Sequence, residues 1–238
     1  MKYVVVTLAV LLSLAMAVPL GVLLWLKYGL WALAFYAAMF VALPLSSLLH
    51  EAGHMLFGAL VKIKAVPHFS LFGSSSCEII PRTDKNLKAR VFFTAIGGLI
   101  INLLFVVPEV IAVCVPSCPY WVGILSPASA YLLILNVFPV QYAGGATDGL
   151  VCWNLLDDDN DETKVMLAVL SVQAQILNGK DIGDIDRDLL FDLPQISEDS
   201  QSFIALCELC YKYCEATGDG ENAQKYKDRF EQLKNDYL

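Results

Sequence analysis

The first two thirds of the chain alternate between long uncharged apolar runs and short polar connections. The apolar runs cover roughly residues 3–26, 30–60, 91–113 and 121–139. Each run is close to or longer than the ~20 residues that a helix needs to cross a bilayer. This pattern predicts an all-α polytopic membrane protein with about four transmembrane helices. The last third instead has the mixed polar and apolar spacing of soluble helices.

The first apolar run has two interpretations. Met1-Lys2, the apolar residues that follow and Ala15-Met16-Ala17 are similar to a signal peptide with a small-residue cleavage site. However, the run continues without interruption to Leu26, which is longer than the core of a usual signal peptide. Residues 1–29 are therefore interpreted as an N-terminal transmembrane anchor.

Composition and charge separate residues 157–238 from the rest. The chain is 57% hydrophobic and 17% charged with a mean hydropathy of +0.58, which is too apolar for a soluble protein of 238 residues. Residues 1–156 hold 8 basic and 5 acidic side chains (net +3), whereas residues 157–238 hold 8 and 19 (net −11). So acidic a segment excludes nucleic acid as a partner. Residues 157–238 are predicted to form a small soluble α-helical domain, which either docks a protein partner or only keeps this end of the chain in water.

The Lys and Arg side chains predict how the chain is oriented in the bilayer. Six of them lie between the second and third apolar runs: Lys62, Lys64, Arg82, Lys85, Lys88 and Arg90. The connection between the third and fourth runs has none. Because cytoplasmic loops are rich in Lys and Arg, the N-terminus, the 62–90 loop and the acidic domain are predicted to be cytoplasmic.

Two of the three histidines lie inside the second apolar run, in His50-Glu51-Ala52-Gly53-His54. On a helix, His50 and His54 share a face and can bind one metal ion, while Glu51 lies beside the water that the metal carries. Ionisable residues within a membrane span are costly and usually functional. The pentapeptide therefore predicts a Zn²⁺ site for hydrolysis, with Glu51 as the catalytic base. The alternative is a chance match to the motif.

A catalytic zinc ion needs a third protein ligand and an open position for water. Glu109 and Asp148 are the other acidic side chains in or next to the apolar runs. Glu109 lies about 28 Å along a helix from the cytoplasmic Arg90, so it is predicted to be an interfacial carboxylate near the far surface. Asp148 follows the fourth run, which returns to the cytoplasmic side, and Pro139 predicts an irregular chain before it. Asp148 is the predicted third ligand.

The connection after the second run predicts a short β-hairpin at the membrane surface. Its strands are expected at residues 66–72 and 76–80, with Gly73 and a serine turn between them. An exposed edge of this hairpin would accept an extended substrate as an additional strand.

Three motifs, in this order along residues 30–156, make the chain similar to the site-2 protease type of intramembrane zinc metalloprotease. The histidine pentapeptide matches the first motif of the family. Gly98 and Asn102 resemble its Gly-x-x-x-Asn pattern, while Asn136-Val137-Phe138-Pro139 and Asp148-Gly149 resemble its Asn-x-x-Pro and Asp-Gly elements. The family usually places the Asp eight residues after the Asn, whereas here the separation is twelve.

This resemblance implies a three-helix catalytic core within residues 30–156 and hydrolysis of a peptide bond in or near a transmembrane segment. His50, His54 and Asp148 would hold the zinc, and Glu51 would accept the proton of the water. Asn136 would bind the substrate backbone or the oxyanion, unless its amide only satisfies carbonyls near Pro139. The substrate would be a membrane protein, a signal-peptide-like segment or a peptide precursor, and the expected location is a bacterial plasma membrane.

Two other interpretations remain open. The chain would be a catalytically silent adaptor if its acidic helices recruit a partner and its metal site is only structural. It would be a different membrane zinc peptidase, such as a prenyl-protein protease, if a Glu completed the site. The late Asp-Gly pair argues against the second, and the intact set of His50, Glu51, His54 and Asp148 argues against the first.

Overall fold

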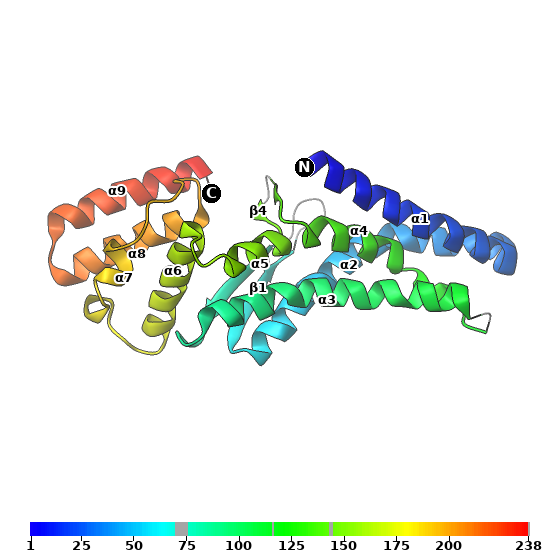
Figure 1. The fold of residues 1–238 in the computed structure, drawn as a ribbon, viewed down its shortest axis with the longest axis horizontal. Helices are drawn as coiled ribbons and strands as arrows, with labels where there is room; N and C mark the ends of the chain where they lie inside the picture. The colour runs from blue at the N-terminus through cyan, green and yellow to red at the C-terminus, as the bar shows by residue number, and fades with distance from the viewer. Residues whose placement is uncertain (70–75, 116, 143–144, 238) are drawn as a thin grey trace. The chain divides into compact units, whose positions relative to one another are not determined.

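A computed structural model describes residues 1–69, 76–115, 117–142 and 145–237. It is mostly helical, as predicted, and has a small two-stranded sheet (Figure 1). Its contacts group the chain into two units. Unit 1 contains Met1–Val61, Ala65–Glu78 and Phe92–Trp153, and unit 2 contains Lys62–Lys64, Ile79–Val91 and Asn154–Leu238.

Unit 1 is a bundle of long apolar helices. Helix α1 (Lys2–Tyr28) and helix α2 (Ala32–Leu60) are joined by the short 3-10 helix η1 (Gly29–Trp31) and contact each other. Helix α3 (Leu87–Cys114) follows the hairpin, and helix α4 (Ser126–Val137) contacts both α1 and α2 (Figure 1). Pro139 explains where α4 ends, since the residue before a proline avoids helical geometry and Phe138 is extended.

The outer faces of these helices are apolar. Trp31 and Phe40, for example, are 79% and 85% exposed. Within the described residues, three segments are long and apolar enough to cross a membrane, namely Lys2–Leu60, Leu87–Cys114 and Tyr120–Val137. The first of these contains both α1 and α2, so it includes the two N-terminal runs seen in the sequence. Water would disfavour so many exposed apolar side chains, whereas lipid would solvate them.

A two-stranded sheet connects α2 to α3. Strand β1 (Ile63–His68) pairs with strand β2 (Ser76–Pro81), and the backbone N–H of Arg82 continues the pairing by donating to the Lys62 carbonyl at 3.0 Å. The first strand begins earlier than predicted from the sequence. It ends at His68, while residues 70–72 of the predicted strand and Gly73 lie outside the described residues.

A second, smaller hairpin lies between α4 and helix α5 (Asp148–Leu156). Strand β3 (Gln141–Tyr142) pairs antiparallel with strand β4 (Gly145–Ala146), so Gln141 lies opposite Ala146. Thr147 closes this loop, because its hydroxyl accepts from the backbone N–H groups of Val140 and Leu150, each at 3.2 Å, and donates to the Phe138 carbonyl at 2.7 Å. The loop therefore brings the start of α5 back to the end of α4.

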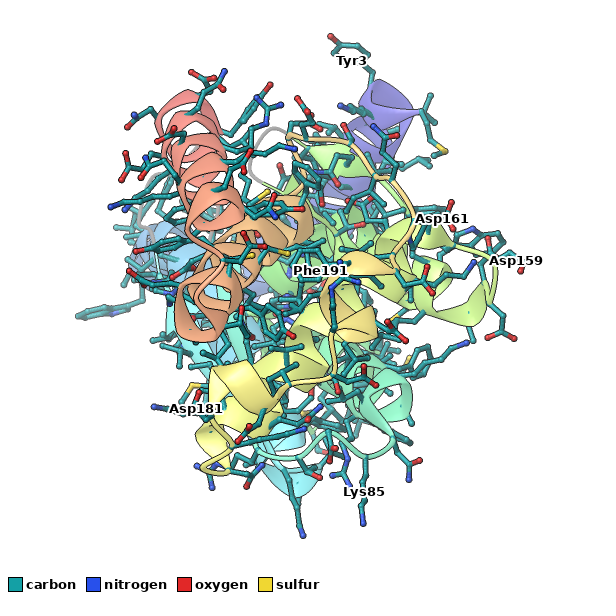
Figure 2. The ribbon with its side chains drawn as sticks, turned by 90° about the vertical axis from the view of Figure 1, so that its left-hand side faces the viewer. Tyr3, Lys85, Asp159, Asp161, Asp181 and Phe191 are labelled. Carbon is teal, nitrogen blue, oxygen red and sulfur yellow. The ribbon has the colours of Figure 1, made fainter. Side chains whose placement is uncertain are left out.

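Most of unit 2 is a small helical domain. It consists of helices α6 (Asp161–Leu177), α7 (Asp188–Phe191), α8 (Gln201–Thr217) and α9 (Gly220–Tyr237), with the 3-10 helix η3 (Ile182–Asp184). Asn160 caps α6 by accepting from the Thr163 N–H at 2.8 Å, and Gly218 ends α8 with the left-handed φ of 80° that glycine tolerates. Acidic side chains such as Asp159 and Asp181 lie on its surface (Figure 2).

The core of this domain is formed by α6, α7 and α8. Its buried members are Val165, Val169, Val172, Ile185, Leu190, Leu206, Leu209 and Cys210. The Cys210 thiol faces the Leu190 carbonyl at 3.6 Å, and burial raises the pKa of this thiol to about 12. Cys210 is therefore a neutral core residue at physiological pH. No metal-binding group in the described part of unit 2 involves it.

Candidate metal centre

The three predicted metal ligands meet at one point of unit 1. His50 and His54 lie on α2, one turn apart, and Asp148 is the first residue of α5. Within the described residues, these three side chains form one group whose donor atoms all lie within 4.8 Å of one another. His50 and His54 are buried at 6% and 5% exposure, and Asp148 is partly buried. Asp148 lies 94 positions after His54 in the sequence, yet the three side chains form a compact N,N,O donor set.

The separations within this group match a tetrahedral metal site. His50 Nε2 lies 3.1 Å from His54 Nε2 and 3.1 Å from Asp148 Oδ2. His54 Nε2 lies 3.4 Å from Asp148 Oδ1. A tetrahedron with metal–ligand bonds of about 2.0–2.1 Å has edges of about 3.3 Å. The two nitrogens and the Asp148 carboxylate, which presents one oxygen to each of them, are therefore close enough to share one small metal ion.

Helix α3 orients both imidazole rings from the side opposite the ligand atoms. His54 Nδ1 donates to the Thr94 carbonyl at 2.8 Å, and His50 Nδ1 lies 2.9 Å from the amide of Asn102. Since the His54 proton is on Nδ1, the Nε2 atom presents a bare lone pair to His50 and to Asp148. Partners of this kind fix the tautomer and direction of metal-binding histidines.

The polar atoms that lack partners also fit a bound cation. Among the described residues, Asp148 Oδ2 and Asn102 Oδ1 are buried without a hydrogen-bond partner. A cation beside the histidines would neutralise the charge of the Asp148 carboxylate. Metal binding through His50 Nε2 would place the ring proton on Nδ1, and the Asn102 amide would turn so that Oδ1 accepts it. The donor set therefore fits a divalent metal ion.

Glycines allow α2 and α3 to cross at this point. A Cβ on Gly53 would lie 2.5 Å from the Gly97 carbonyl oxygen, and a Cβ on Gly97 would lie 2.6 Å from the Gly53 oxygen. A Cβ on Gly98 would lie 2.6 Å from His54 Nε2 and 2.7 Å from His50 Nε2. The sequence indicated Gly98 only as part of a family motif. In the structure Gly98 makes room for the two ligand nitrogens themselves.

The β3–β4 hairpin accommodates the longer spacing between Asn136 and Asp148. Because Gln141 pairs with Ala146 and Tyr142 with Gly145, the chain returns to the end of α4 in spite of the additional residues. Gly149 is needed at this return, because a Cβ there would overlap the Val137 carbonyl oxygen. Asp148 also lies in the first turn of α5, where the helix dipole favours a carboxylate.

Glu51 is buried beside the ligands, at 4% exposure, and its Oε2 has no hydrogen-bond partner within the described residues. The Cys77 thiol of β2 is also near these carboxylates. Burial, followed by the charges of Glu51 and Asp148, raises the pKa of this thiol to about 12. Strand β2 thus approaches the candidate site, and nothing in the sequence indicated that Cys77 lies near it.

Two other candidates from the sequence, Asn136 and Glu109, are not among the grouped metal-binding side chains. The Asn136 side chain donates to the Leu132 carbonyl of its own helix at 3.0 Å, so its role toward a substrate stays a prediction. Glu109 was expected at the far interface, but it is 3% exposed and packs within unit 1 against Gly123. Neither residue belongs to the metal-binding group.

Replacing Asn102 with Ala is expected to lower zinc affinity by about 10- to 100-fold, because His50 loses the partner that orients its ring. Asn102→Asp should retain affinity, since a carboxylate accepts the same Nδ1 proton. The measurement is competition of the purified variants with a zinc-binding dye. Ser126→Ala is the matched control, because Ser126 is equally buried and donates to the Phe105 carbonyl at 2.7 Å, away from the histidines. Equal losses in Asn102→Ala and Ser126→Ala would contradict the role of Asn102.

Comparison with known proteins gives no match for this chain, whether with protein-family models, curated proteins or solved structures.

Proposed function

We propose that this chain is an intramembrane zinc metalloprotease that hydrolyses a peptide bond in or near a transmembrane segment of its substrate. The observation that carries the proposal is the close grouping of the His50, His54 and Asp148 donor atoms beside the buried carboxyl of Glu51. Two imidazoles and one carboxylate, with one position open, are typical of catalytic rather than structural zinc sites. The position of this set on an apolar helix favours a substrate within the membrane.

In this proposal, α1 and α2 each cross the bilayer, so that the chain crosses four times with α3 and the segment 120–137. The N-terminus, residues 62–90 and the acidic domain lie in the cytoplasm, because the connection 62–90 carries most of the basic side chains of residues 1–156. His54 lies six residues before the end of α2, about 9 Å from it, so water reaches the site from the cytoplasmic side. The membrane is expected to be a bacterial plasma membrane.

Each residue of the site has a defined task in the proposed reaction. His50, His54 and Asp148 would hold the zinc ion, which would supply a water with a near-neutral pKa and a Lewis acid for the scissile carbonyl. Glu51 accepts the proton of the attacking water and delivers it to the leaving amine. The burial of Glu51, at 4% exposure, excludes bulk water from this proton transfer. Asn136 is the proposed donor to the substrate backbone, once its amide leaves the Leu132 carbonyl.

Removal of the metal tests this proposal. Detergent-purified protein is expected to cleave a peptide that contains an apolar transmembrane-like segment, and mass spectrometry should locate the cut within or next to that segment. A zinc chelator should stop cleavage, and about one equivalent of zinc should restore it. Cleavage that continues without metal would contradict the proposal, as would cleavage only in soluble unstructured peptides.

A further inference from the structure

Four basic residues lie, along the chain, between the end of α2 and the start of α3, close to one of these two helix ends. Lys62 and Lys64 follow the end of α2 at Leu60 by two and four residues, and Arg82 and Lys85 precede the start of α3 at Leu87 by five and two. All four are exposed and belong to unit 2. Lys62 and Arg82 are adjacent in space, because the Arg82 N–H donates to the Lys62 carbonyl at 3.0 Å. We call these four residues the junction cations.

The junction cations keep their charges available. Within the described parts of the chain, no ion pair involves any of the four, although unit 2 is strongly acidic. Lys88, the second residue of α3, differs because it pairs with Asp158. Figure 2 shows Lys85 extending outward at the surface, apart from the labelled acidic residues Asp159 and Asp161. The positive charge of this surface is therefore not neutralised by the protein itself.

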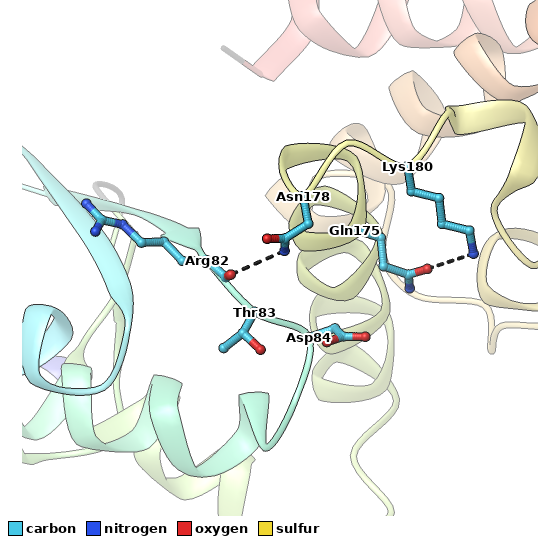
Figure 3. Close-up of a pocket in the computed structure, with 6 residues that line it drawn as sticks. All are labelled: Arg82, Thr83, Asp84, Gln175, Asn178 and Lys180. Carbon is cyan, nitrogen blue, oxygen red and sulfur yellow. Dashed lines mark hydrogen bonds between the residues drawn. The ribbon is translucent and has the colours of Figure 1, made fainter.

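The Arg82 guanidinium also points away from the cavity beside this residue. This cavity, of about 360 Å³, is lined by Arg82, Thr83, Asp84, Gln175, Asn178 and Lys180. The Arg82 carbonyl accepts from the Asn178 amide at 3.2 Å, while its guanidinium extends away from Asp84 and from the cavity (Figure 3). The carboxylate of Asp84 and the C-terminal end of α6 also make the cavity itself unfavourable for an anion. Anion binding is thus expected on the outer side, where the guanidinium points.

The backbone at Lys62 gives a second, independent observation. Lys62 lies two residues after the end of α2 and has a φ of 60°. In this left-handed conformation glycine is usual and a side chain is strained. A lysine at this position therefore places a charge at the helix end in spite of the strain. Strained positions of this kind often have a function, since packing alone would accept glycine.

We propose that Lys62, Lys64, Arg82 and Lys85 bind the phosphate groups of anionic phospholipids at the membrane surface. The position of all four within five residues of an apolar helix end favours lipid over a soluble phosphate. Basic clusters next to a membrane span attract anionic headgroups, and each charge adds to the attraction. The inference rests on the membrane insertion contained in the proposed function, but it does not depend on catalysis.

A double variant, Lys62→Gly with Lys85→Gln, tests the proposal without loss of the fold, because glycine relieves the left-handed strain at position 62. Native mass spectrometry of the detergent-purified full chain would be titrated with phosphatidylglycerol or with phosphatidylcholine. Wild type is expected to prefer phosphatidylglycerol, and the double variant should bind it about tenfold more weakly. Its thermal stability should equal or exceed that of wild type.

The matched control is Lys225→Gln with Lys234→Gln on α9, which makes the same change in net charge. It should bind phosphatidylglycerol like wild type. The proposal would be overturned by unchanged binding in the junction variant, by an equal loss in the control, or by equal binding of the two lipids. Displacement by excess inorganic phosphate would also overturn it, since the ligand would then be a soluble anion. Zinc content measured in the same samples reports separately on the proposed catalytic site.

Discussion

Replacing Glu51 with Gln is expected to reduce peptide-bond hydrolysis by about 10²- to 10⁴-fold while leaving the bound zinc in place. Glutamine has nearly the same shape as glutamate, so the buried position beside the histidines is kept. It has no basic oxygen for the proton of the attacking water, however, and it carries none to the leaving amine. Single-turnover cleavage of an apolar peptide substrate, together with elemental analysis of zinc, measures both quantities in one preparation.

Glu78→Gln is the control for this variant. Glu78 lies on β2, is exposed, and faces His68 at 3.4 Å rather than the metal ligands. It should cleave at the wild-type rate. Full activity in Glu51→Gln would show that another group is the base, and loss of its zinc would show that Glu51 belongs to the metal site instead. A wild-type protein that binds zinc but cleaves no substrate would favour the silent adaptor.

The apolar helices were predictable from the sequence because hydropathy is a local property. Each apolar run contains enough consecutive residues to define a span without knowledge of its neighbours. The helices of the acidic domain were also predictable, since Gly179 and Gly218 mark helix ends. The start of β1 was harder to predict. Lys62 and Arg82 pair through their backbones, and the residues around them have no strong strand pattern.

The ligand set could be predicted for a different reason. The spacing of His50 and His54 defines one face of a helix, and Asp148 is one of few acidic residues near the apolar runs. Their separations of 3.1–3.4 Å could not be predicted, because they depend on how α2, α3 and α5 pack. The β3–β4 hairpin, which returns Asp148 to the end of α4, likewise depends on pairing between residues that show no strong strand pattern.

The residues that support the ligands were recognised least well. Asn102 and Gly98 matched a motif, but the motif did not say that one contacts His50 and the other lies against both imidazoles. Thr94 acts through its backbone carbonyl, so its side-chain type carries no signal. Contacts of this kind depend on the crossing of α2 and α3 at Gly53 and Gly97, which is a property of tertiary packing.

Replacing Asp148 with Ala is expected to lower zinc affinity by more than the roughly 100-fold that loss of an outer partner causes. The variant removes one of three protein ligands and leaves two neutral imidazoles in a buried site. Asp148 faces both histidines, at 3.1 and 3.4 Å, and it supplies the carboxylate of the described metal-binding group. Hydrolysis should be lost together with the metal. Asp158→Ala is the control, because Asp158 is exposed and pairs with Lys88.

The zinc content of detergent-purified wild type, Asp148→Ala and Asp158→Ala, determined by elemental analysis after reconstitution with zinc and removal of the excess, tests the metal centre most directly. About one zinc per chain is expected in wild type and in Asp158→Ala, and almost none in Asp148→Ala. Equal zinc in all three proteins would contradict Asp148 as a ligand. The absence of zinc from wild type would contradict the metal centre itself.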